Sequence, residues 1–130
     1  MRKLLFICIF LFSCKQQKNH STYIIILNYD EYSRGGYSPA EKKDTISANN
    51  DTVAFKKGFS LFSNEIFMSK DVGSGRSNPM RKNISFKVVD KNGKNIQEKL
   101  SKRVIDSIEN KINKETEQIF NDLKKIRKSN

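Results

Sequence analysis

The sequence predicts an α+β fold: a small antiparallel sheet with two helices packed on it, of which the C-terminal helix is long. Three patterns support this prediction. Residues 22–29 are mostly apolar and β-branched or aromatic, as in a strand. Residues 51–69 and 97–128 instead carry apolar side chains at spacings of three and four, which is typical of amphipathic helices. We expect one domain over 22–130, with 22–29 and 84–96 in its sheet.

The first strand is predicted at 22–29, which reads TYIIILNY. Its three consecutive isoleucines do not alternate with polar residues. Such a run is typical of a strand that is buried on both faces. This segment is therefore expected to lie at the centre of the sheet.

Residues 30–44 predict a loop, because they combine a Gly-Gly pair, a proline and clustered charges. Three aromatic residues, Tyr29, Tyr32 and Tyr37, lie on or beside this segment. Aromatic side chains on a long loop can form an interaction surface. The alternative, which we favour, is that they fold back as a lid on the core. A short extended piece is expected next, at 45–48.

The first helix is predicted at 51–69. Residues 49–52 read NNDT and are all favourable N-cap residues. Phe55, Phe59, Phe62 and Ile66 then recur at spacings of four, three and four, which places them on one helix face. Gly58 and the many phenylalanines weaken the helix pattern, so a β-hairpin is the alternative.

A second loop is predicted at 70–83, where Gly and Ser are frequent. The alternation of apolar and polar residues over 84–90 predicts a strand. Asn92-Gly93 then indicates a type I′ turn, followed by a short returning strand at 94–96.

The second helix is predicted at 97–128. Ile105, Ile112, Ile119 and Ile126 repeat every seven residues, which is the spacing of a coiled-coil seam. The matching seam positions are 108, 115 and 122, and two of them are acidic, so the seam is broken. We favour a helix that packs across the sheet with its end projecting.

The first fourteen residues predict an export signal. Arg2 and Lys3 precede an unbroken apolar run from Leu4 to Phe12, and the chain turns polar after Cys14. That run has the length of a signal-peptide core and is too short to span a bilayer as a helix.

Leu11-Phe12-Ser13-Cys14 resembles the lipobox of bacterial lipoproteins. The resemblance implies that residues 1–13 are cleaved off as a signal peptide and that Cys14 carries the lipid, so that 14–21 form a flexible tether. Phe12 departs from the smaller residue usual at its position, and an ordinary secretory leader is the alternative. The resemblance also implies a cell-envelope location; Lys15, which is not acidic, favours the outer membrane.

The mature domain would hold no thiol, because Cys8 lies in the leader and Cys14 would be lipidated. Disulfides and cysteine-based catalysis or metal sites are thereby excluded. His20 is the sole histidine and lies in the expected tether. We therefore expect no catalytic residue, no metal and no cofactor.

The net charge of +11 raises the question of an anionic partner. Lysine far outnumbers arginine and the basic residues are dispersed, so specific nucleic-acid binding is not expected. The sequence favours a binding module held at the membrane through Cys14, with an envelope protein as partner. The alternatives are a membrane-tethered small-ligand module or enzyme, and a charge-driven binder of anionic polymer or lipid.

Overall fold

A computed structural model describes residues 20–33, 35–70 and 80–128 of the chain. The signal peptide, Cys14 and most of the expected tether lie outside these residues, as do residues 71–79 of the second expected loop. His20 is exposed, and Ser21, the last residue of the expected tether, already belongs to the first strand.

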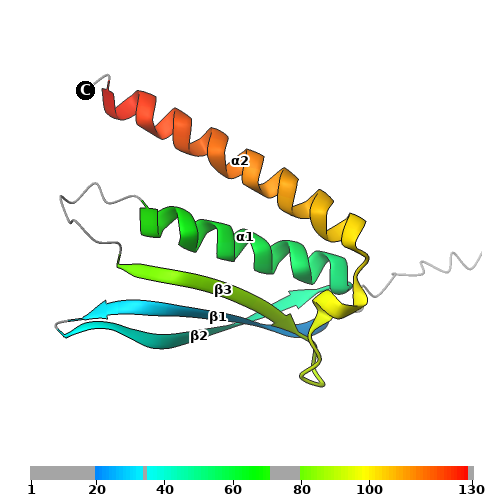
Figure 1. Cartoon of the computed structure of the whole chain (residues 1–130). Coiled ribbons are helices and arrows are strands. Elements are labelled where there is room, and N and C mark those ends of the chain that lie inside the picture. The colour runs from blue at the N-terminus through cyan, green and yellow to red at the C-terminus, as the bar shows by residue number, and fades with distance from the viewer. Residues whose placement is uncertain (1–19, 34, 71–79, 129–130) are drawn as a thin grey trace, which may run out of the picture.

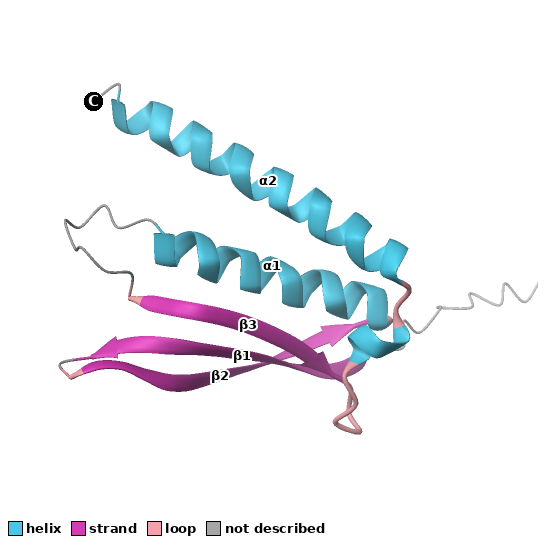
Figure 2. Cartoon of the chain, in the orientation of Figure 1, coloured by secondary structure: helices cyan, strands magenta, loops and turns pink. Residues whose placement is uncertain are grey.

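The α+β fold is confirmed: three antiparallel strands and two helices, the second of them long, form three layers (Figures 1 and 2). The strand order is β2-β1-β3, and α1 covers one face of the sheet. The long helix α2 lies on the far side of α1 rather than directly across the sheet. The elements are β1 (Ser21–Ser33), β2 (Gly36–Ala48), α1 (Asp51–Lys70), β3 (Arg81–Val89), the 3-10 helix η1 (Ile96–Lys99) and α2 (Lys102–Lys128).

The central strand β1 has one buried face and one partly open face. Tyr23, Ile25 and Leu27 point toward α1 and are among the core residues, each at most 5% exposed. Burial on both faces is therefore wrong for Ile24, which is 37% exposed on the other side of the sheet. Ile26 on that open side is only 9% exposed and has Lys43 and Lys87 as its cross-strand neighbours.

The loop predicted at 30–44 is wrong, because these residues form the second half of a long hairpin. β1 continues to Ser33 and β2 begins at Gly36, with every residue from 21 to 33 paired across the two strands. Gly36 has a φ of 119°, which only glycine adopts readily. The charged residues that argued against a strand prediction lie on the edge strand β2. There the Lys43 ammonium lies 2.7 Å from the Glu41 carboxylate. The extended piece expected at 45–48 is the end of β2.

The free edge of β2 is protected from further strand pairing. Because Ser33 and Gly36 close a two-residue hairpin, the backbone groups of odd-numbered residues in β2 point away from β1. Pro39 has no N–H to offer on that edge. Farther along, the Lys57 ammonium of α1 donates a 2.7 Å hydrogen bond to the Ser47 carbonyl.

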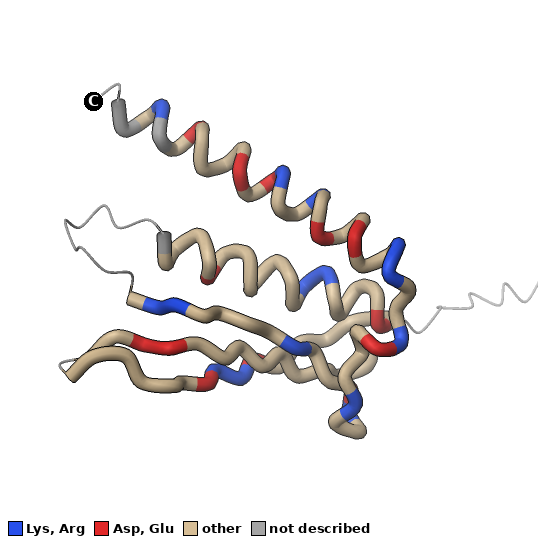
Figure 3. Tube along the Cα trace, in the orientation of Figure 1, with Lys and Arg blue, Asp and Glu red and all other residues tan. Residues whose placement is uncertain are grey.

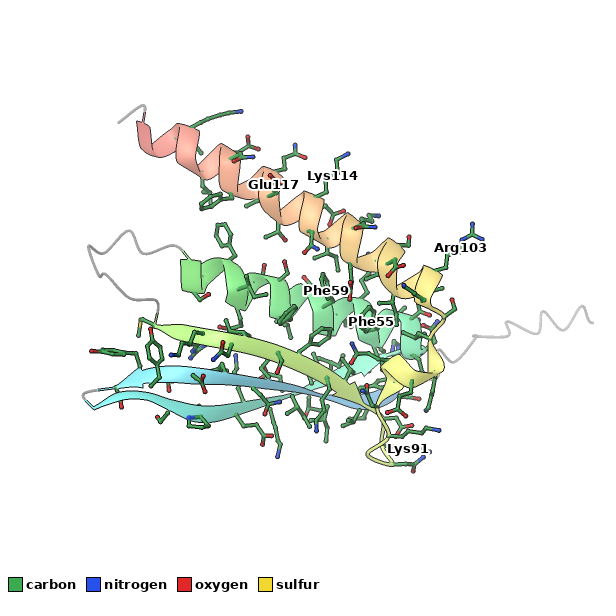
Figure 4. All side chains as sticks on the ribbon, in the orientation of Figure 1. Phe55, Phe59, Lys91, Arg103, Lys114 and Glu117 are labelled. Carbon is green, nitrogen blue, oxygen red and sulfur yellow. The ribbon has the colours of Figure 1, made fainter. Side chains whose placement is uncertain are left out.

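The helix predicted at 51–69 is confirmed as α1. Its N-cap is Asn50, whose side chain accepts a 2.9 Å hydrogen bond from the Val53 amide. Phe55 and Phe59 point from α1 into the sheet (Figure 4) and surround Phe86 of β3, with ring centroids 5.8 and 5.7 Å from its ring. Gly58 lies between them, and a Cβ there would collide with Cγ2 of Val88. The glycine that weakened the helix prediction therefore permits close packing of helix on sheet.

The turn after β3 is not type I′. That turn needs positive φ at both central residues, but of the pair only Gly93 has it, at 77°. The Asp90 carboxylate organises the turn: it accepts hydrogen bonds from the amides of Asn92 and Lys94 at 2.9 and 3.0 Å. The returning strand predicted at 94–96 is reduced to a single bridge between Val89 and Asn95.

The long helix α2 begins at Lys102 rather than at 97, since 96–99 form η1. Ser101 caps it, accepting a 3.4 Å hydrogen bond from the Val104 amide. Ile112 belongs to the buried core, and Ile105 and Ile108 pack against it. Farther along, α2 meets α1 through the hydroxyls of Ser63 and Thr116, which lie 3.2 Å apart.

Gly58→Ala should destabilise the domain. The added methyl group meets a fully buried valine that has no room to move, and overpacking of this kind costs about 1–3 kcal/mol. The gain in helix propensity offsets about 1 kcal/mol of this cost. Urea unfolding of Gly58→Ala and of Lys56→Ala, an exposed control on the same helix, measures the difference. An alanine at position 58 that is as stable as glycine would contradict the close contact.

The ionised form of Asp90 should stabilise the domain only above acidic pH. The hydrogen bond from Lys99, at 2.6 Å, and those from the backbone of Lys94 and Asn92 lower the pKa of Asp90 to about 2. The side chain of an aspartate in an unfolded chain has a pKa of about 3.9. The stabilisation is thus complete above that pH and is lost as the pH falls toward 2.

The destabilisation caused by Asp90→Asn, followed by thermal unfolding, should be constant above about pH 5 and shrink below about pH 4. Asp106→Asn, on an exposed position of α2, serves as the control. A difference between wild type and Asp90→Asn that does not change with pH would show that the charge of Asp90 has no part in the turn.

Candidate functional site

The far end of the β1–β2 hairpin extends beyond α1 and carries the candidate site (Figure 1). We call its four exposed or half-buried side chains the hairpin tip. They come from the end of β1, the start of β2 and the residues around the start of β3. The hairpin tip consists of Tyr32, Tyr37, Met80 and Lys82.

The two tyrosines of the hairpin tip form a cross-strand pair. Tyr32 and Tyr37 are directly opposite in the hairpin register, and their rings meet edge to face with centroids 5.2 Å apart. The Lys82 ammonium lies 3.8 Å from the centroid of the Tyr37 ring, within the range of a cation–π contact. Tyr32 stays 50% exposed. The pair thus presents an aromatic surface that is already ordered.

Met80 completes the hairpin tip. The Tyr32 amide donates a 2.9 Å hydrogen bond to the Met80 carbonyl, which ties the start of β3 to the end of β1. The Met80 side chain is 55% exposed. Aromatic residues and methionine are enriched at the centres of protein interfaces, whereas lysine is depleted there. Tyr32, Tyr37 and Met80 therefore suit the centre of an interface, and Lys82 suits its polar rim.

Tyr29 lies on the opposite face of the sheet from Tyr32 and Tyr37. Its ring packs against the core, with the Arg81 guanidinium 4.4 Å above its centroid. Arg81 is held in turn by Glu65 of α1 at 2.6 Å and by Glu31 of β1 at 3.3 Å. Partial burial alone would lower the pKa of Arg81, but the attraction of Glu65 and its hydrogen bond raise it. The contacts of Arg81 thus link the hairpin to α1.

A surface hollow of about 310 Å³ lies beside the hairpin tip. Asn83, whose φ is 53°, donates a 2.7 Å hydrogen bond from its side chain to the Asp30 carboxylate at its edge. Asparagine tolerates this left-handed conformation better than most residues. The pairing between β1 and β3 shifts register here, between Asn28 and Asp30. The remaining lining comes from Asn28, Tyr29, Pro39, Ala40 and Glu41.

Within residues 20–33, 35–70 and 80–128, no group of three or more His, Cys, Asp or Glu side chains could hold a metal ion. Over the same residues, no helix combines the length and apolar character needed to cross a bilayer.

The sequence named three tyrosines as a possible interaction surface, and the structure separates them. Tyr32 and Tyr37 come together, whereas Tyr29 packs inward from the strand β1. The lid on the core that we favoured does not form, because residues 30–44 belong to the hairpin. Met80 and Lys82 were not expected beside the tyrosine pair. Their position depends on the pairing of β3 with β1, which brings residues about fifty positions apart together and leaves no signal in the sequence.

Comparisons with protein-family models, with curated proteins and with solved structures gave no match to this chain. The properties of the hairpin tip therefore have to be inferred from its own residues.

The two classes of tyrosine should differ in their effect on stability. Tyr29→Ala removes a ring that packs on the core and should cost about 2–3 kcal/mol, whereas Tyr32→Ala removes a half-exposed ring and should cost at most about 1 kcal/mol. Tyr29→Phe is the matched control, because it keeps the ring under Arg81 and should change stability little. Equal losses for the two alanine variants in urea unfolding would contradict this division.

Proposed function

We propose that this chain is a lipid-anchored protein of a bacterial cell envelope, whose domain is a binding module that contacts a partner protein through the hairpin tip. The observation that carries this proposal is the aromatic pair at the end of the hairpin, in which Tyr32 is exposed and Tyr37 is half-buried. β1 has thirteen residues, so the tip lies about 40 Å from Ser21, where the tether would join the domain.

The anchor follows from the resemblance of Leu11-Phe12-Ser13-Cys14 to a lipobox. One acyl chain binds a bilayer only marginally, and two or more hold a protein there stably. Residues 14–20 would then form a tether of at most about 25 Å. We favour the outer membrane, with the domain facing the periplasm or the cell surface.

A protein partner suits the hairpin tip better than a small molecule does. Small ligands are bound in concave pockets that bury most of their surface, whereas the tip is the end of a two-stranded hairpin. Exposed aromatic residues on a rigid element are typical anchors of protein interfaces.

The ion pairs on the sheet argue against charge-driven binding of an anionic polymer or lipid. Several basic side chains of the sheet already meet carboxylates of the same domain. These ion pairs are Lys42 with Glu65, Lys43 with Glu41, and Arg81 with Glu31 and Glu65.

A photo-reactive phenylalanine analogue at position 32 of the full chain tests the partner surface in intact cells. We expect irradiation to give one discrete cross-linked product. The same analogue at Thr45, which is exposed on the same face of the sheet but away from the tip, is the matched control. No product at position 32, or the same product from both positions, would refute the hairpin tip as the contact surface.

Cys14→Ser tests the anchor in the same cells. This variant should leave the membrane fraction, keep residues 1–13 uncleaved by the lipoprotein signal peptidase, and lose most of the cross-linked product if the partner is held at the membrane. A variant that fractionates and is processed like wild type would refute the lipid anchor without bearing on the hairpin tip.

A further inference from the structure

One end of the domain carries a group of exposed basic side chains that the proposed function does not use. They come from the turn after β3 and from the first turn of α2. We call these four side chains the basic end: Lys91, Lys94, Lys102 and Arg103. Figure 4 labels Lys91 and Arg103, and both extend away from the domain into solvent.

The fold places the basic end beside the start of β1. Because β3 pairs antiparallel with β1, the turn after β3 lies next to the first residues of β1. The Lys99 ammonium lies 2.6 Å from the Asp90 carboxylate and 3.9 Å from the Asp51 carboxylate, which holds the segment leading into α2 at the same end. The basic end therefore lies at the same end of the domain as Ser21, where the tether would join (Figures 1 and 3).

The charges of the basic end are not balanced by carboxylates. Residues 90–103 hold five basic and two acidic side chains; of the two acids, Asp90 is paired with Lys99 and Glu98 is exposed. Among the described residues, no carboxylate forms an ion pair with a member of the basic end. The ion pairs that argue against charge-driven binding lie on the sheet instead. The basic end thus retains an excess of positive charge.

The start of α2 is an unusual place for two cations. Its first turn contains Lys102 and Arg103 and no acidic residue. The positive end of the helix dipole lies in this turn, so acidic side chains stabilise it and basic side chains do not. The stability of α2 therefore does not explain the two cations, whereas an anionic surface outside the domain would.

We propose that the basic end rests on the anionic phospholipid headgroups of the leaflet that holds the lipid anchor, and that this contact orients the domain. The inference rests on the lipid anchor of the proposed function. A tether from Cys14 to Ser21 keeps this end within about 25 Å of the bilayer. Electrostatic attraction reaches only about 8–10 Å, so the tether brings the basic end within range. Each Lys or Arg close to an anionic bilayer then strengthens binding about fivefold.

This orientation would present the hairpin tip to a partner. β1 runs from the end that holds Ser21 to the hairpin tip, and its thirteen residues span about 40 Å. With the basic end on the headgroups, the tip points away from the membrane. A soluble anionic polymer would require no particular end of the domain. The position of the charges at the tether therefore favours the bilayer as the occupant.

Fluorescence quenching on vesicles tests this orientation. The lipid-modified protein, expressed from the full chain, is reconstituted into vesicles of phosphatidylcholine or of an equimolar mixture of phosphatidylcholine and phosphatidylglycerol. A dye is attached at Asn92→Cys, in the turn of the basic end, or at Ser33→Cys, at the hairpin turn. A quencher on the headgroups then reports which dye lies near the bilayer. Protein without an added cysteine corrects for labelling of Cys8 and Cys14.

We expect the anionic lipid to increase the quenching at position 92 several-fold and to leave position 33 unquenched, because the two positions are separated by about the length of β1. High salt should remove the increase, since it screens the attraction between the basic end and the headgroups. Two paired charge reversals should each remove most of it: Lys91→Glu with Lys94→Glu, and Lys102→Glu with Arg103→Glu. The second pair should not lower the melting temperature, because acidic side chains suit the first turn of a helix.

Lys111→Glu with Lys114→Glu is the matched control, because both positions are exposed on α2 outside the basic end and the change in net charge is the same. Equal quenching at position 92 on the two kinds of vesicle, or an equal loss in the control, would overturn lipid as the occupant of the basic end. Stronger quenching at position 33 than at 92 would overturn the orientation. Failure of wild type to float with phosphatidylcholine vesicles would instead refute the lipid anchor, and with it the orientation that depends on it.

Discussion

The close contact between α1 and the sheet at Gly58 sets how the helix and the strands pack together. The helix can approach β3 only because no side chain stands between its backbone and Val88. Phe55 and Phe59 on either side of the glycine then reach Phe86, and Phe62 stacks on the same ring with centroids 4.7 Å apart. This aromatic group fills the space between helix and sheet, so it fixes which face of every strand is buried.

Which face of β1 is buried determines whether each tyrosine points into the core or toward solvent. Side chains alternate between the two faces of a strand, so Tyr23 and Tyr29 of β1 follow the buried isoleucine and leucine inward. Tyr32 has the opposite parity and falls on the open face, where the hairpin register places Tyr37 directly across from it. A displacement of one residue in this register would bury the tip pair and expose the core, which is why pairing along the whole hairpin matters for the surface at its end.

The surface proposed as a contact, the hairpin tip, lies at one end of the domain (Figure 1). The hairpin tip and the end of α2 both extend past α1, because β1, β2 and α2 are all longer in space than the helix between them. The other end holds Ser21, the turn organised by Asp90, and Tyr23, whose hydroxyl donates a 2.9 Å hydrogen bond to Asp51. The chain would thus be tethered at one end and make its contacts at the other.

The α+β class, the central strand, the first helix and most of the long helix follow from the sequence, because each shows a local pattern of apolar residues. Which of residues 49–52 caps the first helix does not, and the structure assigns that place to Asn50. The sequence did not reveal β2 or the pairing of Tyr32 with Tyr37. Lys42, Lys43 and Asp44 read as loop residues, since their strand conformation is stabilised by bonds to β1 and by ion pairs rather than by their own propensity. Which aromatic residues meet depends on the pairing of the strands, because cross-strand contacts join residues that the local sequence does not relate.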